Sequence, residues 1–141
     1  MHPLLTQLVS AAGLVLVMTL VHGAGVVGIA HWLGLDRARS ESGRLHPRTM
    51  ALLSAMTLLL FCLHMIEIGL FGLFYLWVGA VADLEEALYY SASAYSTLAQ
   101  PDSTFPVAWR IVGALEGLVG FLLIGWSTAF FVTDMNKLLR A

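Results

Sequence analysis

The sequence predicts an all-α membrane protein with three transmembrane helices and a short re-entrant helix between the second and the third. Of its 141 residues, 59% are hydrophobic and 11% are charged, and the mean hydropathy is +0.83. Apolar runs of 18 or more residues with few charges are typical of transmembrane helices. Three such runs cover residues 4–35, 49–81 and 111–133. This composition excludes an ordinary soluble domain.

The first apolar run, residues 4–35, carries no formal charge. It lacks the basic n-region and the short apolar core of a cleavable signal peptide. We therefore expect residues 1–35 to form a retained N-terminal transmembrane helix. Gly23, Gly25 and Gly28 lie in this run, and small residues at such spacing allow membrane helices to approach closely.

Charged residues are segregated between the loops. Residues 36–48 form a basic loop, whereas the segment between the second and third runs is acidic. Lysine and arginine in short loops favour the cytoplasmic side, so we expect the N-terminus outside and the C-terminus in the cytoplasm. The net charge of −2 gives no reason to expect a nucleic-acid partner. The residues concerned are Arg37, Arg39, Arg44 and Arg48 in the basic loop, and Asp83, Glu85, Glu86 and Asp102 in the acidic segment.

The segment of about 25 residues between the second and third runs is long for a simple hairpin. Asp83 is suited to cap a helix, and Glu86 three residues later completes a capping-box pattern. A helix over residues 84–97 would be about 20 Å long, which is too short to cross a bilayer core of about 30 Å. The irregular stretch 97–102 follows it. This order predicts a re-entrant loop, which is tolerated at membrane depth only where it is buried in protein or faces water.

Two segments carry a resemblance to a known family. Residues 83–91 and 109–128 resemble the pore domain of the tetrameric potassium-channel superfamily, in its small bacterial members. The resemblance implies a pore domain over residues 49–141, with an outer helix at 49–81 and an inner helix at 107–137. It also implies a homotetramer in the lipid bilayer of the bacterial inner (plasma) membrane.

The loop after the short helix departs from the filter of this family, which usually reads TTLGYGD. Carbonyl groups of that filter replace the water shell of potassium, on a backbone that needs glycine at positive φ. Ala99 would cost about 1–2 kcal/mol in such a conformation, and the ring of Pro101 excludes it. We therefore expect a poorly selective cation pore with monovalent cations as permeant ions, and a non-conducting or proton-conducting relative is the alternative. The filter-like residues are Ser96, Thr97, Leu98, Ala99, Gln100, Pro101 and Asp102.

Ionisable residues inside membrane helices are functional candidates, because their burial is costly. His64 and Glu67 share one face of the second helix, and Glu116 lies within the third. Two interpretations stay open: a His64–Glu67 or His64–Glu116 hydrogen-bonded clasp, and a proton-sensing gate or cavity-lining charge, since imidazole titrates near physiological pH. Gly120 matches the hinge glycine of the family, and simple helix packing is its alternative role.

A different class of protein is also compatible with the sequence. His22 and His64 both fall near the middle of their spans, so a bis-histidine haem between the first two helices is an alternative. We expect no cofactor and no metal, because no metal-ligand spacing appears. We also expect no enzymatic activity, because no nucleophile lies at a characteristic spacing from a general base.

Overall fold

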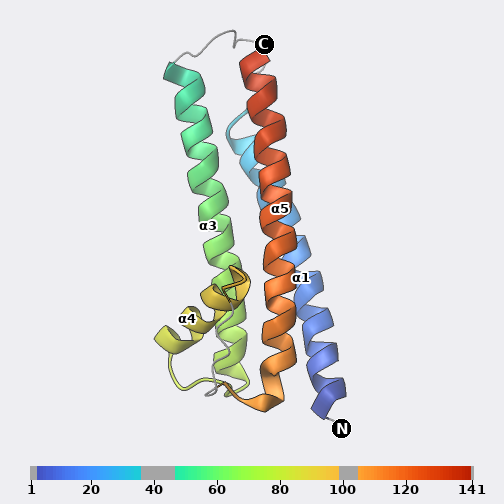
Figure 1. Cartoon of the computed structure of the whole chain (residues 1–141). Helices are drawn as coiled ribbons and strands as arrows, with labels where there is room; N and C mark the ends of the chain where they lie inside the picture. Colours follow the sequence, from blue (N-terminus) through green and yellow to red (C-terminus); the bar gives the residue numbers. More distant parts are fainter. Residues whose placement is uncertain (1–2, 36–46, 99–104, 141) are drawn as a thin grey trace.

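The computed structural model describes residues 3–35, 47–98 and 105–140 of the chain (Figure 1). Every regular element in these ranges is helical. The elements are α1 (Pro3–Trp32), α3 (Pro47–Trp77), α4 (Leu84–Tyr95), the 3-10 helix η1 (Val107–Trp109) and α5 (Arg110–Arg140).

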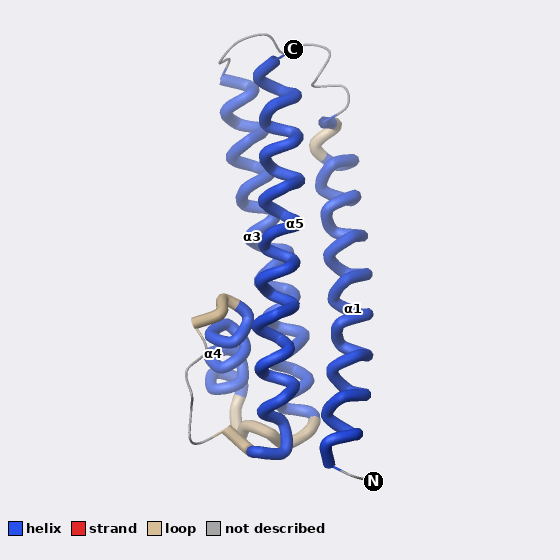
Figure 2. The backbone as a smooth tube through the Cα atoms, turned by 45° about the vertical axis from the view of Figure 1, so that its right-hand side comes forward, coloured by secondary structure: helices blue, strands red, loops and turns tan. Residues whose placement is uncertain are grey.

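Three of the helices are long and apolar enough to cross a membrane. The candidate spans are 4–32, 47–77 and 107–139. Helices of this length rise more than about 40 Å, which exceeds the bilayer core of about 30 Å. They lie side by side along most of their length, with α3 antiparallel to α1 and α5 (Figures 1 and 2). The chain therefore has the three spanning-capable helices of a multi-pass membrane protein, as the sequence predicted.

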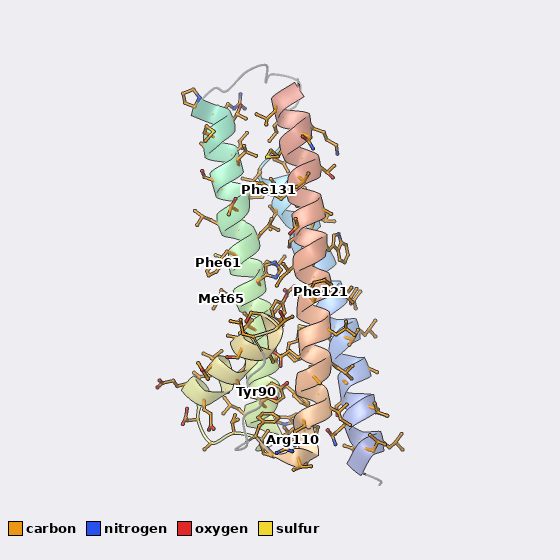
Figure 3. The ribbon with its side chains drawn as sticks, viewed as in Figure 1. Phe61, Met65, Tyr90, Arg110, Phe121 and Phe131 are labelled. Carbon is orange, nitrogen blue, oxygen red and sulfur yellow. The ribbon has the colours of Figure 1, made fainter. Side chains whose placement is uncertain are left out.

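The outer surface of this bundle is apolar. Phe61 and Met65 project from the outer side of α3 (Figure 3), and Phe61 is 63% exposed. Trp32 and Trp77, the last residues of α1 and α3, are also exposed. Tryptophan is enriched where membrane helices meet the lipid headgroups. A large apolar surface ending in tryptophans is what a bilayer, rather than water, accommodates.

The short helix α4 has the predicted N-cap, Asp83, but Glu86 does not return the expected capping-box bond to the Asp83 N–H and contacts Ala82 N instead. The backbone N–H of Glu86 donates to Oδ1 of the N-cap residue Asp83 over 2.8 Å, and Glu86 Oε2 accepts from Ala82 N over 3.4 Å. The helix ends at Tyr95 rather than at 97. The reason is backbone geometry: Thr97 has a φ of 61°, which lies in the left-handed region where helices commonly terminate.

Glycines allow α4 to pack closely against α5. A Cβ atom on Gly117 would lie 3.0 Å from the Ala94 carbonyl oxygen, and one on Gly120 would lie 2.1 Å from the Tyr95 carbonyl oxygen. No side chain could be added at Gly120 without a shift of backbone, so packing, one of the two roles expected for this glycine, is present. Gly120 follows the start of α5 by about ten residues, or about 15 Å of helical rise. The C-terminal end of α4 therefore lies part way along the bundle, on the half where α1 begins (Figure 2).

The glycines of α1 serve the packing of that helix in the same way. A Cβ atom on Gly25 would lie 2.5 Å from Leu63 Cδ1, and one on Gly23 would lie 3.4 Å from the Trp126 ring. Gly28, by contrast, faces open space. Two of the three expected small-residue contacts are thus present, and they bring the middle of α1 against α3 and α5.

Two apolar core clusters occupy the two halves of the bundle. One includes Met18 and Phe71, and the other includes Val26 and Leu63. The sequence positions between these pairs hold the buried polar residues of α1 and α3, described below. The polar groups therefore lie between two apolar layers, away from either end of the helices.

Candidate intramembrane polar site

Glu67 of α3 is the centre of a buried polar cluster. Its side chain has no exposed surface, and its Oε1 lies 2.8 Å from His22 Nδ1 of α1. Its Oε2 lies 3.0 Å from His64 Nδ1, one turn earlier on α3, and accepts a hydrogen bond from the Tyr95 hydroxyl of α4. The second ring nitrogen of His22, Nε2, faces Ser127 Oγ of α5 at 3.4 Å. We call these five residues the Glu67 cluster.

The hydrogen bonds of the Glu67 cluster can all be satisfied together. An ionised carboxylate only accepts, and a neutral imidazole carries one N–H and one acceptor nitrogen. With the proton on Nδ1, His22 donates to Glu67, and its Nε2 accepts from Ser127. The Nδ1–H of His64 is shared between Glu67 and the Tyr95 oxygen, which is 2.9 Å away. Tyr95 in turn donates to Glu67, so each buried polar atom has a partner.

The Tyr95 hydroxyl remains a hydrogen-bond donor to Glu67 in this arrangement. Burial raises the pKa of Tyr95 above its ordinary value, and the hydrogen bond to the Glu67 carboxylate adds to the rise. Both effects disfavour the ionised phenolate. The hydroxyl therefore stays protonated and holds the last residue of α4 to α3.

A second buried carboxylate, Glu116 of α5, lies in a separate set of contacts. The Tyr75 hydroxyl of α3 donates to Glu116 Oε2 over 2.6 Å. Ser91 Oγ of α4 lies 2.5 Å from Glu116 Oε1 and 2.8 Å from the Ile68 carbonyl oxygen, so its single hydrogen serves two acceptors. Glu116, Tyr75 and Ser91 form the Glu116 cluster, which joins three helices.

Both clusters hold α4 by the same face. Ser91 and Tyr95 are four residues apart, a spacing that places two side chains together on one side of a helix. One reaches the carboxylate on α5 and the other reaches the carboxylate on α3. The C-terminal half of α4 is therefore fixed against two spans through hydrogen bonds to two buried carboxyl groups.

The structure decides between the pairings expected from sequence. His64 is bonded to Glu67, whereas Glu116 is bonded to Tyr75 and Ser91 and not to His64. The sequence predicts His22 only as an alternative haem ligand, and it does not predict the hydroxyl groups that bond the two carboxyl groups and His22. One sequence signal was available for two of them: the i, i+4 spacing of polar residues on the short helix. The unpredicted partners are Tyr75, Ser91, Tyr95 and Ser127.

The histidine rings are arranged around the carboxylate. The ring centroids of His22 and His64 are 5.5 Å apart, and each turns Nδ1 toward Glu67. The ring of Trp126 lies 5.1 Å from that of His22 and covers one side of it. Because a carboxylate binds both Nδ1 atoms, this geometry favours the hydrogen-bonded clasp over a haem held between the two rings.

Three residues of the filter-like loop are described. Ser96, Thr97 and Leu98 are exposed, and Leu98 has 74% of its surface accessible. The Ser96 hydroxyl donates back to the Ala92 carbonyl over 2.7 Å. The other four, Ala99, Gln100, Pro101 and Asp102, lie outside the described residues.

Comparisons of the chain with models of protein families, with curated proteins and with solved structures found no match. The features that bear on function are therefore the order of the helices, the position of α4 and the two buried clusters. These features describe a short helix that packs against two spans and is held to them by polar contacts.

We predict that Tyr75→Phe lowers the free energy of unfolding by about 1–3 kcal/mol, because it leaves a buried oxygen of Glu116 without its hydrogen-bond partner. The variant removes the Glu116 donor and leaves the ring in place. Tyr89→Phe is the matched control, because Tyr89 is 64% exposed, and it should change stability by less than about 0.5 kcal/mol. Denaturant titration in detergent micelles measures both. Equal effects of the two substitutions would contradict a stabilising role for the Glu116 cluster.

Proposed function

We propose that this chain is one subunit of a pore-loop ion channel that resembles the potassium-channel superfamily and conducts monovalent cations with weak selectivity. The observation that carries the proposal is the position of α4. Its C-terminal end packs beside Gly117 and Gly120 of α5, part way along the bundle, and the filter-like segment 97–102 follows at once. A re-entrant helix and loop between two spans would have this arrangement.

The electrostatics of α4 suit a cation. The C-terminal end of a helix carries a partial negative charge, and in α4 this end is the one that lies deep along the bundle. Several copies arranged around one axis would direct these ends to a common point, and Asp102 would add an acidic ring near the mouth. This site would attract cations whether or not the loop distinguishes one cation from another.

Weak selectivity follows from the residues of the loop. Ala99 and Pro101 stand where the family has glycines, so the backbone that presents stacked carbonyl rings is excluded. Thr97 and Leu98 match the positions of the innermost site of the family, and that site alone would remain. A pore with one site and a wider hydrated entrance would discriminate poorly between potassium and sodium.

A pore of this kind requires several copies, because one chain with a single re-entrant segment cannot enclose a channel. The exposed apolar residues of α4, including Leu84 and Leu88, would be covered by neighbouring subunits. We predict that the purified protein has a mass near four times the 15.3 kDa of the chain. Mass measurement from detergent micelles, or chemical crosslinking, tests this. A stable monomer or dimer alone would be incompatible with the proposed pore.

The proposed orientation places the N-terminus outside and residues 36–48 in the cytoplasm, because of the four arginines in that loop. The half of the bundle that carries α4 would then open to the outside. Single cysteines at His2 and Ser42 test this, in a Cys62→Ala background because Cys62 is exposed. A membrane-impermeant reagent added to intact cells should label position 2 and spare position 42. Preferential labelling at position 42 would reverse the orientation.

We predict that the unmodified protein in liposomes passes potassium and sodium at similar rates. The triple variant Ala99→Gly, Gln100→Tyr, Pro101→Gly should gain potassium preference, because it restores the two glycines and the aromatic residue. Gln100→Tyr alone is the control: it supplies the aromatic residue without the backbone freedom, and should gain none. Cation-selective flux measurements with each ion provide the readout.

The outcomes of this flux experiment separate the alternatives. Strong potassium selectivity in the unmodified protein would overturn the backbone argument. Proton flux without potassium or sodium flux would favour the proton-conducting alternative. No flux of any ion, in a protein shown to be assembled and correctly inserted, would favour the non-conducting one.

A further inference from the structure

Three potential metal-ligand atoms converge in the Glu67 cluster. Within residues 3–35, 47–98 and 105–140, one ring nitrogen each from His22 and His64 and one carboxylate oxygen of Glu67 all lie within 4.8 Å of one another. They come from α1 and α3. His22 precedes the other two by more than forty positions, and helix packing brings it to them.

We propose that His22, His64 and Glu67 bind one divalent transition-metal ion, Zn²⁺ in the first instance, as a structural ion between α1 and α3. Imidazole nitrogen and carboxylate oxygen bind Zn²⁺ at about 2.0–2.2 Å, so tetrahedral ligand atoms are roughly 3.3 Å apart. The two His–Glu contacts, 2.8 Å from His22 Nδ1 to Oε1 and 3.0 Å from His64 Nδ1 to Oε2, involve the two different oxygens of the carboxylate. An ion would take the place of the hydrogen-bond protons between the rings and the carboxylate after a rearrangement of the side chains, and binding would release those protons.

The surroundings of the three ligands match what a metal site needs. Ligating histidines usually place their other ring nitrogen on a hydrogen-bond partner, and ligating carboxylates are themselves hydrogen-bonded. Ser127 Oγ lies 3.4 Å from His22 Nε2, and the Tyr95 hydroxyl donates to Glu67 Oε2. With Nδ1 on the metal, His22 would carry its proton on Nε2 and donate it to Ser127. Both outer partners are therefore in position to orient ligands.

The burial of the cluster indicates a structural role for the ion. His22 and Glu67 have no exposed side-chain surface, and His64 has 17%. Catalytic zinc sites keep one coordination position open to substrate. In the buried Glu67 cluster, a substrate could not reach such a position. The ion would instead join α1 to α3, and through Tyr95 it would brace the end of α4. This inference does not depend on whether the pore conducts.

The test measures metal retention by the intact purified protein. The protein is stripped with a chelator, loaded with one equivalent of Zn²⁺ per chain, and passed through a desalting column before elemental analysis. We expect about one zinc per chain to be retained. Loading with Co²⁺ instead should give the visible absorption bands of a tetrahedral site with nitrogen and oxygen ligands. Retention of no zinc by the folded wild-type protein would overturn the proposal.

Two ligand variants and one control locate the ion. His22→Asn and His64→Asn each place an amide near the Nδ1 position, and this amide can still donate a hydrogen bond to Glu67. Each variant should weaken zinc binding by more than about 100-fold, which is the upper end of the effect of losing an outer partner. Ser127→Ala should weaken it by about 10–100-fold. The control replaces His2, His31 and His46 together by asparagine and should retain zinc fully.

Helicity and elution volume on size exclusion show whether each variant is folded. Zinc lost from the control variant, or retained undiminished by folded His22→Asn and His64→Asn, would place the ion elsewhere and refute the site. If both ligand variants fail to fold, the cobalt spectrum of the wild-type protein decides: bands of a tetrahedral site with histidine ligands support the proposal, and their absence refutes it.

Discussion

The arrangement of this bundle depends on the burial of two carboxylates. Glu67 and Glu116 have at most 1% of their surface exposed, within an otherwise apolar structure. A buried carboxyl group without hydrogen-bond partners costs free energy whether it is ionised or neutral, so each one must collect partners from neighbouring helices. Glu67 collects them from α1, α3 and α4, and Glu116 from α3 and α4. Since the hydrophobic effect does not distinguish between the faces of apolar helices in lipid, these contacts and the close packing at glycines determine which faces meet.

The glycines of α5 complement the carboxylates. Polar contacts specify where α4 lies, but they form only if the backbones can approach within hydrogen-bonding reach of short side chains such as serine. Gly117 and Gly120 remove the obstacle where the Ala94 and Tyr95 carbonyl groups meet α5. If α5 bends at Gly120, the bend would fall where α5 contacts the end of α4. Such a bend would either keep this contact or break it together with the two clusters.

Sequence reasoning recovered those parts of the structure that local patterns determine. The three long helices followed from apolar length, and the start of α4 followed from Asp83 and Glu86. The His64–Glu67 contact followed from spacing within one helix. The contacts of His22 and Tyr75 did not follow, because α1 and α3 are apolar around their whole circumference and offer no stripe from which a facing side could be read. Thr97 ended α4 early through a positive φ that is unusual for a β-branched residue.

The position of the clusters bears on how the loop after α4 can diverge from the potassium-channel pattern. A filter-like segment is normally constrained at both of its ends. Here the incoming end is fixed by Ser91 and Tyr95, whose carboxylate partners lie on two separate spans. The contacts that hold the end of α4 to α3 and α5 come from side chains that precede residues 97–102, so the proposed channel could keep this helix in place with a loop that lacks the glycines of a potassium filter.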